Sequence, residues 1–530
     1  MKLTDFNTDN QLGYAVAAAT TVKYDLIELC GLTGEGLLVG TTDYAAVSNC
    51  TYGTSQTSTA TGQVITHTTV HSQIGETYSR QQMAIDSSGN IFVLTCYSSS
   101  TGITLKKYAP SGALLGSVDV DTTATTTYSL RLVTLSNGNL CVSYNISSTL
   151  KYAIYDTNLL EVKALTTLSA TALLYSDVIA LSGGGFAAVF AMSGTPLESK
   201  LATFDNAGTA VLAATIVWTR TGTTGNQFHR ITQLSSGNIA YAISSVNTVS
   251  SIGLYYGVTD VSGAIVKAFT SLDATSISIA PELVSNGAGY FAIARPNSTN
   301  QVAWVFNNAG TEQGSSFSSA TSAGNTTAKT KLVASGTTMY LLWHKSSTSK
   351  AMVTSIPITG TGHVTGTVTT PTTQYNFYLD AFYEDGYIVA VSMPGASAIA
   401  PQMWVVDTAT MQLVNSAGTT FGTAASASSG TQPRVLSGGD RTFIAVYDYT
   451  STSGTFLCAG KWANTAILGV AEADTATASS IPLRVQAGAY KINTINGTKS
   501  KAFDMSATNL VGNKGAMVAN GFVTLTGIGV

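Results

Sequence analysis

The chain carries little charge. Only 10% of its 530 residues are Asp, Glu, Lys or Arg, well below the ~25% typical of soluble domains. The formal net charge is −3, and no basic run occurs that could follow a phosphate backbone. The sequence therefore predicts no nucleic-acid partner. A surface rich in Ser, Thr and Asn suits permanent packing against other proteins, because few ions must be desolvated.

Cysteine and histidine are scarce, and their spacing does not indicate a metal site. The cysteines show no CxxC or Cys/His pattern, so we expect buried free thiols. His67 and His71 lie four residues apart on a predicted strand, about 13 Å apart, which is too far for one ion to bridge. The pairs His229–Arg230 and Trp343–His344 are isolated and are interpreted as structural. The five cysteines are Cys30, Cys50, Cys96, Cys141 and Cys458.

Long hydrophobic runs are absent. Residues 1–10 are polar and lack the apolar stretch of a secretory signal. The apolar stretch 178–192 is interrupted by Gly183–Gly185 and is too short to span a bilayer. We therefore expect a protein made in a cytoplasm, without a signal peptide and without membrane insertion.

What the sequence does contain is a repeat. Its clearest copy is residues 83–97, which read as a strand, a polar turn at Gly89–Asn90 and a second apolar strand. The turn glycine recurs at intervals of 46 to 53 residues. A second marker, an aromatic or aliphatic residue followed by an Asp, Asn or small-residue turn, recurs in phase at 108–112, 155–158 and 204–208. The turn glycines are Gly36 (a weak copy), Gly89, Gly138, Gly184, Gly237, Gly287, Gly336, Gly386 and Gly439.

Each repeat predicts four short strands. In the unit around Gly89 they are expected at 80–85, 91–97, 104–108 and 114–120. No segment shows a sustained helical period. Units of ~50 residues with four strands are typical of β-propeller blades. A β-solenoid would have repeats of ~20–30 residues, and tandem sandwiches would need ~100-residue units. We expect an all-β propeller with seven or eight blades, the number depending on whether the Gly36 copy forms one.

Three regions follow from this pattern. Residues 1–30 form an N-terminal lead-in, residues 31–462 the propeller, and residues 463–530 a small all-β domain for attachment or oligomerisation. Basic residues in the last region are interleaved with polar turns and are interpreted as a solvated face.

The last region also carries a resemblance. The strings Ile467–Ala471 (ILGVA) and Ile481–Gln486 (IPLRVQ), joined by a small-residue and acidic turn, resemble the short β-domain of tail-fibre, head-fibre and decoration proteins of tailed bacteriophages. In that family the pattern caps or attaches a virion appendage. The resemblance covers about 12% of the chain. The low charge and the Ser, Thr, Gly and Ala bias also resemble phage structural proteins.

No catalytic motif is visible. The chain lacks a Walker loop, a GxGxxG turn and HExxH, and its turns lack the Trp of the Asp-box turns in propeller glycosidases. Glu384 and Asp385 are adjacent in a turn and should diverge rather than form an acid/base pair. Asp205, Asp260 and Asp407 recur singly, so we expect turn capping rather than Ca²⁺ binding.

Tyrosines are numerous, with 24 in the chain. Exposed tyrosines could stack on sugars, but most lie in strand patterns and should pack between blades. The candidates are Tyr97, Tyr144, Tyr255, Tyr256, Tyr375, Tyr378, Tyr447 and Tyr449.

The sequence thus predicts a structural protein of a tailed-phage virion, a tail or fibre component that assembles with other virion proteins. We expect a homo-oligomer, a location in the virion and a role in host attachment, in which the partner would be a host-surface glycan. The first alternative is a carbohydrate-binding propeller. The second is a propeller-fold glycan hydrolase or lyase, which would need a convergent polar cluster in the central channel that the sequence does not reveal. The sequence therefore predicts no enzyme, no cofactor, no metal and no catalytic residue.

Overall fold

Every helix-or-strand element in the described part of the chain is a β-strand. The computed structural model describes side chains within residues 81–458, apart from loop gaps, chiefly at 97–101, 220–227, 245–252, 320–329, 344–350, 367–378, 393–401, 414–432 and 448–456. Elsewhere it describes only strands and their pairing. No described element is a helix long and apolar enough to cross a membrane.

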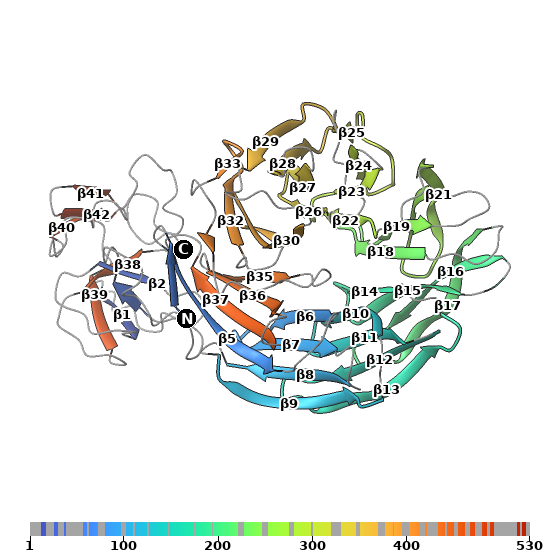
Figure 1. Cartoon of the computed structure of the whole chain (residues 1–530), viewed down its shortest axis with the longest axis horizontal. Helices are drawn as coiled ribbons and strands as arrows, with labels where there is room; N and C mark the ends of the chain where they lie inside the picture. Colours follow the sequence, from blue (N-terminus) through green and yellow to red (C-terminus); the bar gives the residue numbers. More distant parts are fainter. Residues whose placement is uncertain are drawn as a thin grey trace.

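Eight sheets stand in a ring, so the predicted β-propeller is confirmed and has eight blades (Figure 1). Neighbouring blades touch through their innermost strands, and the last of these, β35, contacts the first, β6. The ring is therefore closed. The blades are numbered in chain order from β6, and each sheet is antiparallel, with its strands running outward from the axis.

Blades 1 to 4 are complete four-stranded sheets. Blade 1 contains β6 (Arg80–Ile85), β7 (Ile91–Cys96), β8 (Ile103–Tyr108) and β9 (Leu114–Asp121), and blade 2 contains β10 (Thr127–Thr134), β11 (Leu140–Ile146), β12 (Thr149–Tyr155) and β13 (Glu161–Ser169). Blade 3 contains β14 (Asp177–Ala180), β15 (Phe186–Met192), β16 (Leu197–Phe204) and β17 (Ala210–Arg220). Blade 4 contains β18 (Gln227–Gln233), β19 (Ile239–Ser245), β20 (Gly253–Thr259) and β21 (Ile265–Asp273).

Blades 5 to 7 have shorter outermost strands. Blade 5 contains β22 (Glu282–Ser285), β23 (Tyr290–Asn297), β24 (Asn300–Asn307) and β25 (Phe317–Ser318). Blade 6 contains β26 (Lys331–Ala334), β27 (Thr338–Lys345), β28 (Lys350–Pro357) and β29 (Val364–Val368). Blade 7 contains β30 (Phe377–Glu384), β31 (Tyr387–Pro394), β32 (Gln402–Asp407), β33 (Gln412–Leu413) and β34 (Thr419–Thr420).

Blade 8 joins two distant parts of the chain. Its inner strands are β35 (Arg434–Gly439), β36 (Thr442–Tyr449) and β37 (Gly454–Lys461). Its outer strands are β5 (Gln63–Ser72) and β4 (Thr57–Ala60), and β5 pairs antiparallel with β37. The ring is thus closed by hydrogen bonds between residues about 390 positions apart in sequence.

The weak copy at Gly36, which the sequence left open as a blade, lies outside the propeller. Gly36 begins β3 (Gly36–Leu38), which pairs with β2 (Leu26–Leu29) outside the propeller. Strand β2 pairs in turn with β38 (Ile467–Ala471), and β1 (Leu12–Val16) pairs with β39 (Ser480–Arg484). The predicted lead-in and the predicted C-terminal domain therefore contribute strands to one sheet. Three further strands, β40 (Gly488–Lys491), β41 (Met517–Ala519) and β42 (Phe522–Leu525), form another sheet.

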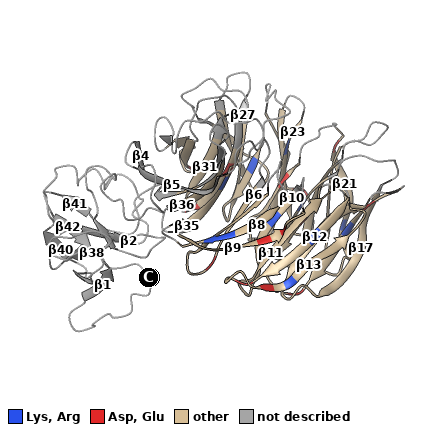
Figure 2. Cartoon of the chain, turned by 60° about the horizontal axis from the view of Figure 1, so that its bottom comes forward, with Lys and Arg blue, Asp and Glu red and all other residues tan. Residues whose placement is uncertain are grey.

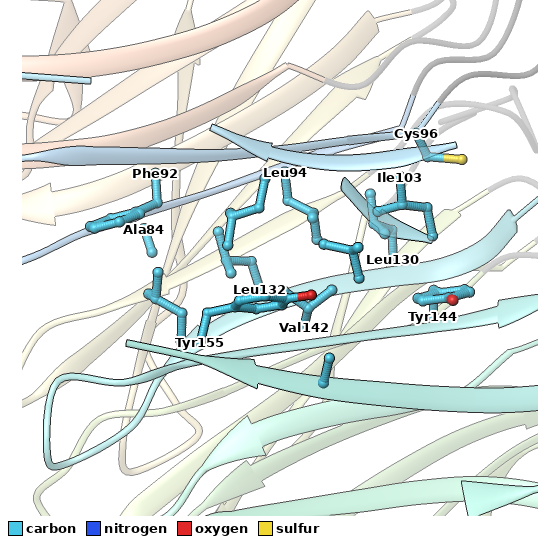
Figure 3. Packing of buried hydrophobic residues seen from close by; sticks show 14 residues of the cluster. Ala84, Phe92, Leu94, Cys96, Ile103, Leu130, Leu132, Val142, Tyr144 and Tyr155 are labelled. Atoms are coloured by element: carbon cyan, nitrogen blue, oxygen red, sulfur yellow. The ribbon is translucent and has the colours of Figure 1, made fainter. Parts of the chain in front are cut away.

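Among the described residues, a hydrophobic cluster lies between each pair of neighbouring blades. Figure 3 shows the cluster between blades 1 and 2, where Phe92 and Leu94 of β7 face Leu132 and Val142 of the next sheet. Every residue of β7 is buried, because the sheet is covered on both faces. This explains why the second strands read as unbroken apolar runs rather than as an alternating pattern.

The repeated turns follow their side-chain chemistry. Asp205 Oδ1 accepts the N–H groups of Ala207 and Thr209 at 2.9 and 2.8 Å. Asp260 caps its own turn in the same way. The next residue in the pattern is Gly208, whose φ of 74° is favourable for glycine. Each turn therefore ends one strand and reverses the chain, so that the next strand pairs antiparallel with it in the same sheet.

Candidate functional site

The innermost strand of each blade places one side chain at the same register position around the axis. In blade 2 this residue is Arg131, which pairs with Ser143 in the second strand. In blade 3 it is Asp177, which pairs with Val189 at the equivalent position. Because this register recurs in every blade, eight residues form what we call the axial ring. From blade 1 to blade 8 its members are Gln82, Arg131, Asp177, Arg230, Glu282, Lys331, Asp380 and Arg434.

The charges of the axial ring alternate. Even-numbered blades contribute Arg or Lys, and odd-numbered blades contribute Asp or Glu, except for blade 1. Blade 1 contributes the neutral Gln82. Alternation keeps like charges apart and gives each cation a carboxylate on a neighbouring blade, which limits the cost of bringing so many ions together.

Two carboxylates of the ring each tie three consecutive blades together. Asp177 forms an ion pair with Nε of Arg131 and accepts the backbone N–H of Ile231 at 3.0 Å. Asp380 repeats the arrangement on the other side of the ring, with Lys331 Nζ at 2.7 Å and a backbone N–H of blade 8 at 3.1 Å. The innermost strand is a sheet edge, so these carboxylates also satisfy N–H groups that lack a ladder partner.

The ring side chains share one electrostatic environment. Burial lowers the pKa of Arg230, and the positive charges of Arg131 and Arg434 in the same ring lower it further. Burial likewise lowers the pKa of Arg434, although Asp380 opposes that shift. Burial also disfavours the charge of Lys331, but the carboxylate of Asp380 outweighs it, so the pKa of Lys331 is raised. Charges on opposite blades interact because they all point toward the axis.

Two cations of the axial ring are partly exposed. The side chains of Arg131 and Lys331 keep 15% and 23% of their surface exposed, whereas those of Asp177 and Asp380 keep 7% each. In these two ion pairs the carboxylates are held against neighbouring backbone, and the cations are the more exposed partners.

Sequence reasoning missed this cluster. It expected no convergent polar group because each member stands alone, about 50 residues from the next. A signal was nevertheless present: Arg131 and Asp177 each stand seven residues before a turn glycine, Gly138 and Gly184, at the start of an apolar run. A lone charge at a fixed position in most repeats indicates a ring of charges when the repeats close into a circle.

A second surface lies on the outermost strands of blades 1 to 4. Their first residues are aliphatic and exposed; Val211 is 73% exposed and Leu160 65%. Strands β9, β13, β17 and β21 have 8, 9, 11 and 9 residues, whereas the outermost strands of blades 5 and 7 have 2. We call this surface the apolar rim. Its members are Leu114, Leu115, Leu160, Val162, Val211, Ile216, Val261, Ile265 and Val266.

Hydrogen bonds join neighbouring blades beside the apolar rim. Lys107 Nζ in blade 1 donates to the carbonyl of Thr157 in blade 2 at 2.7 Å. The Tyr152 hydroxyl of blade 2 donates to the carbonyl of Gly208 in blade 3 at 2.9 Å. These bonds fix the turn before each outermost strand against the preceding blade. In Figure 2 most of the ribbon of β9, β13 and β17 has the colour of uncharged residues, with a few charged positions among them.

The isolated histidine His229 is structural, as the sequence predicted. Its Nε2 lies 3.0 Å from Ser199 Oγ and its Nδ1 lies 2.9 Å from the carbonyl of Tyr175. This is the geometry of a nucleophile and its base, but Ser199 is 0% and His229 1% exposed. A substrate cannot reach the hydroxyl, so the pair connects neighbouring blades. Trp343 is buried as well, and its Nε1 donates to Thr354.

The carboxylates predicted to act in turns do so where the structure describes them. Asp205, Asp260 and Asp407 each cap their own turn. Glu384 accepts a hydrogen bond from Ser437 Oγ of the next blade at 3.0 Å, and Asp385 lies outside the described residues. The side chains of His67, His71 and His344 also lie outside the described residues.

The candidate sugar-stacking tyrosines are mostly packed inside. Tyr144, Tyr256 and Tyr447 are buried, and Tyr255 is half-buried. The predicted packing between blades is thus confirmed for these residues. The remaining candidates, whose side chains the structure does not describe, are Tyr97, Tyr375, Tyr378 and Tyr449.

The thiols behave as predicted where they are described. Cys96, Cys141 and Cys458 are buried and free. Burial raises the pKa of the Cys141 and Cys458 thiols, because the thiolate loses its hydration. Cys30 and Cys50 lie outside the described residues.

No protein-family model and no curated protein matches the chain. Among solved structures, it is similar to polysaccharide lyase Uly1, with 9% identity and a TM-score of 0.39 over 84% of this chain and 98% of that one. It is similar to dihydro-heme d1 dehydrogenase NirN, with 12% identity and a TM-score of 0.39 over 65% and 67%. It is also similar to a prolyl endopeptidase, with 12% identity and a TM-score of 0.39 over 71% of this chain and 55% of that one.

These comparisons correct one prediction. The sequence predicted that the chain is not an enzyme, but the similar structures include a lyase, a dehydrogenase and peptidases. The propeller architecture therefore does not separate this chain from enzymes, and that prediction is withdrawn. At this level of similarity the comparisons carry no argument for any particular substrate or reaction.

Proposed function

We propose that this chain is a structural component of a tailed-bacteriophage virion, in a tail or fibre, and that its apolar rim binds another virion protein. The observation that carries the proposal is the recurrence of exposed aliphatic residues at the same position in four consecutive blades. Single exposed aliphatic residues are ordinary, but a continuous set of them marks an interaction surface.

The rim has the properties of a permanent contact. Its exposed members are aliphatic, and a partner that covers them would bury apolar surface. It covers half of the ring, because blades 5 to 7 have short outermost strands. One partner protein bound to that half would leave the axis and the remaining blades free. A host-surface glycan would then be bound elsewhere on the molecule.

The test asks whether the chain is present in phage particles and whether its presence there depends on the apolar rim. Antibodies against the purified chain are applied to density-purified phage particles from cells that carry its gene. We expect the chain in the particles. A variant with Leu115→Ser, Leu160→Ser, Val211→Thr and Ile265→Thr should fold with a wild-type circular dichroism spectrum but be lost from the particles.

The matched control is Val364→Thr on blade 6, which changes an exposed aliphatic residue outside the four-blade rim. It should enter particles as the wild type does. A wild-type chain that stays in the lysate and never copurifies with particles would refute the virion role. A folded rim variant that enters particles at the wild-type level would refute the rim as the contact.

A further inference from the structure

The axial ring has one position without a charge. Acids occupy blades 3, 5 and 7 as Asp177, Glu282 and Asp380, while blade 1 has Gln82. The ring therefore holds four cations and three carboxylates. The neutral position, Gln82 of blade 1, lies between Arg434 of blade 8 and Arg131 of blade 2. Two ring positions with guanidinium groups therefore flank the neutral one.

The two halves of the ring make this position unusual. Arg131, Asp177 and Arg230 on blades 2 to 4 correspond to Lys331, Asp380 and Arg434 on blades 6 to 8. The ion pair and the backbone contact of the acid are the same in both halves. The blade after Arg230 contributes the acidic Glu282, whereas the blade after Arg434 contributes the neutral Gln82.

Arg434 is the cation at the junction between blade 8 and the neutral position of blade 1. Its Nε donates to the carbonyl of Gln81 at 3.4 Å, across the junction between blades 8 and 1. Within the described part of the chain, neither Arg434 nor its counterpart Arg230 forms an ion pair, but Arg230 has acidic ring positions on both neighbouring blades, whereas Arg434 has one only on blade 7. A fixed guanidinium fork beside an amide donor is complementary to a planar carboxylate.

We propose that the axial ring binds the carboxylate group of a small acidic ligand at Gln82, between Arg434 and Arg131. The ligand supplies at blade 1 the group that Asp177, Glu282 and Asp380 supply at the other odd blades. One uncompensated positive charge accounts for a monoanion, and the amide of Gln82 donates a hydrogen bond where a Glu would repel. The inference is independent of the virion role and of the apolar rim.

The chemistry of the ring favours a carboxylate over a larger or more highly charged anion. The three other odd positions are filled by carboxylates, and alternation is completed by a single negative charge. A dianion would bring an excess negative charge close to the acids of the ring. Acidic sugars and simple organic acids share the required group, and the experiment separates them.

The experiment measures binding to the full chain by isothermal titration calorimetry at constant ionic strength, with sodium acetate, sodium glucuronate, glucose and inorganic phosphate as probes. We expect glucuronate, acetate or both to bind, glucose not to bind, and phosphate to bind more weakly. Tighter binding of glucuronate than of acetate identifies an acidic sugar as the ligand, and the reverse identifies a simple acid. Phosphate binding as tight as that of both carboxylates would overturn the proposal.

Two reciprocal variants test the charge pattern. Gln82→Glu supplies the missing charge and should weaken carboxylate binding by about tenfold or more. Glu282→Gln creates a second neutral position and should preserve the first site or raise the number of bound carboxylates. Carboxylate binding unchanged in a folded Gln82→Glu chain would overturn the proposal.

A third variant does not depend on adding charge to the ring. Arg434→Lys keeps the positive charge but removes the fork, and we expect binding about tenfold weaker. Lys163→Gln, at a half-buried position on outer strand β13, is the control and should bind as the wild type does. Equal binding by Arg434→Lys and the wild type would exclude Arg434 as the carboxylate ligand and overturn the site.

Discussion

Single buried charges hold neighbouring blades together. Asp121, at the end of β9 in blade 1, accepts hydrogen bonds from Tyr144 and, at 3.0 Å, from Lys151, both in blade 2. Burial by itself would raise the pKa of Asp121, but the hydrogen bonds from Tyr144, Thr123 and Lys151 outweigh it and hold the pKa well below its usual value. The charged form is therefore favoured in the folded state.

Replacing this carboxylate should destabilise the propeller. Asp121→Asn leaves Lys151 partly buried without its partner, and we expect a loss of about 2–4 kcal/mol at pH 7. The measurement is urea denaturation followed by tryptophan fluorescence. Asp119→Asn, an exposed carboxylate on the same strand, is the control and should change stability by less than about 0.5 kcal/mol.

The same carboxylate gives a pH dependence of defined sign. The pKa of Asp121 is lower in the folded state than the unfolded value of about 4. Its stabilisation is thus fully present above pH 4 and is lost as the pH falls toward the folded pKa. The wild type should lose stability between about pH 4 and pH 2, and Asp121→Asn should lose less over that interval. Parallel pH profiles for the two chains would contradict the argument.

At the scale of elements, the turns combine two independent requirements. A turn glycine needs a positive φ, and some turn glycines also lie against neighbouring backbone. Gly138 has φ of 88°, and a Cβ added there would meet no atom within 4 Å. Gly185 has φ of 78°, and a Cβ there would lie 1.8 Å from the carbonyl oxygen of Phe204. The sequence predicts Gly138 as a turn glycine and places Gly185 in the glycine run around the turn glycine Gly184, but it cannot show which of them is closely packed.

These two glycines make a matched pair for a stability test. Gly138→Ala should cost about 1–2 kcal/mol, because only the backbone conformation is unfavourable. Gly185→Ala should cost at least about 4 kcal/mol, because strands β15 and β16 must also move apart. Thermal denaturation followed by circular dichroism compares the two variants. Equal shifts in midpoint would show that close packing at Gly185 is not important for stability.

At the scale of the whole molecule, the propeller depends on closure. Each blade contacts the next through its innermost strand, and the contact of β35 with β6 completes the circle. The outer part of blade 8 is β5, which comes from the beginning of the chain. A missing β5 would expose the edge of β37 and remove the hydrogen bonds that hold the two ends of the propeller together.

Deletions around β5 test this dependence. A chain lacking residues 1–73 should unfold at a lower temperature than the full chain and expose apolar surface that binds a hydrophobic dye. A chain lacking only residues 1–50 keeps β4 and β5 and should retain the melting temperature of the propeller. Similar melting of both truncated chains would mean that pairing between β5 and β37 contributes little to closure.

The sequence by itself determined the repeat and therefore the fold class. Turn glycines, Asx turns and apolar runs are local signals, and the predicted strands around Gly89 agree with β6 to β9 within about one residue. It also determined that His229 and the described cysteines are structural. Blade number was left open, because the weak copy at Gly36 has the same local pattern as a turn between strands of a blade.

Only the tertiary structure decided which distant residues meet. Pairing of β5 with β37 fixed the number of blades at eight and excluded Gly36 from the ring. Closure also brought Arg434 into hydrogen-bond contact with the carbonyl of Gln81, 353 positions away in sequence. Local patterns specify strands and turns because those depend on neighbouring residues. The axial ring depends on the angle between successive blades, which is set by packing across the whole circle, and no single repeat contains it.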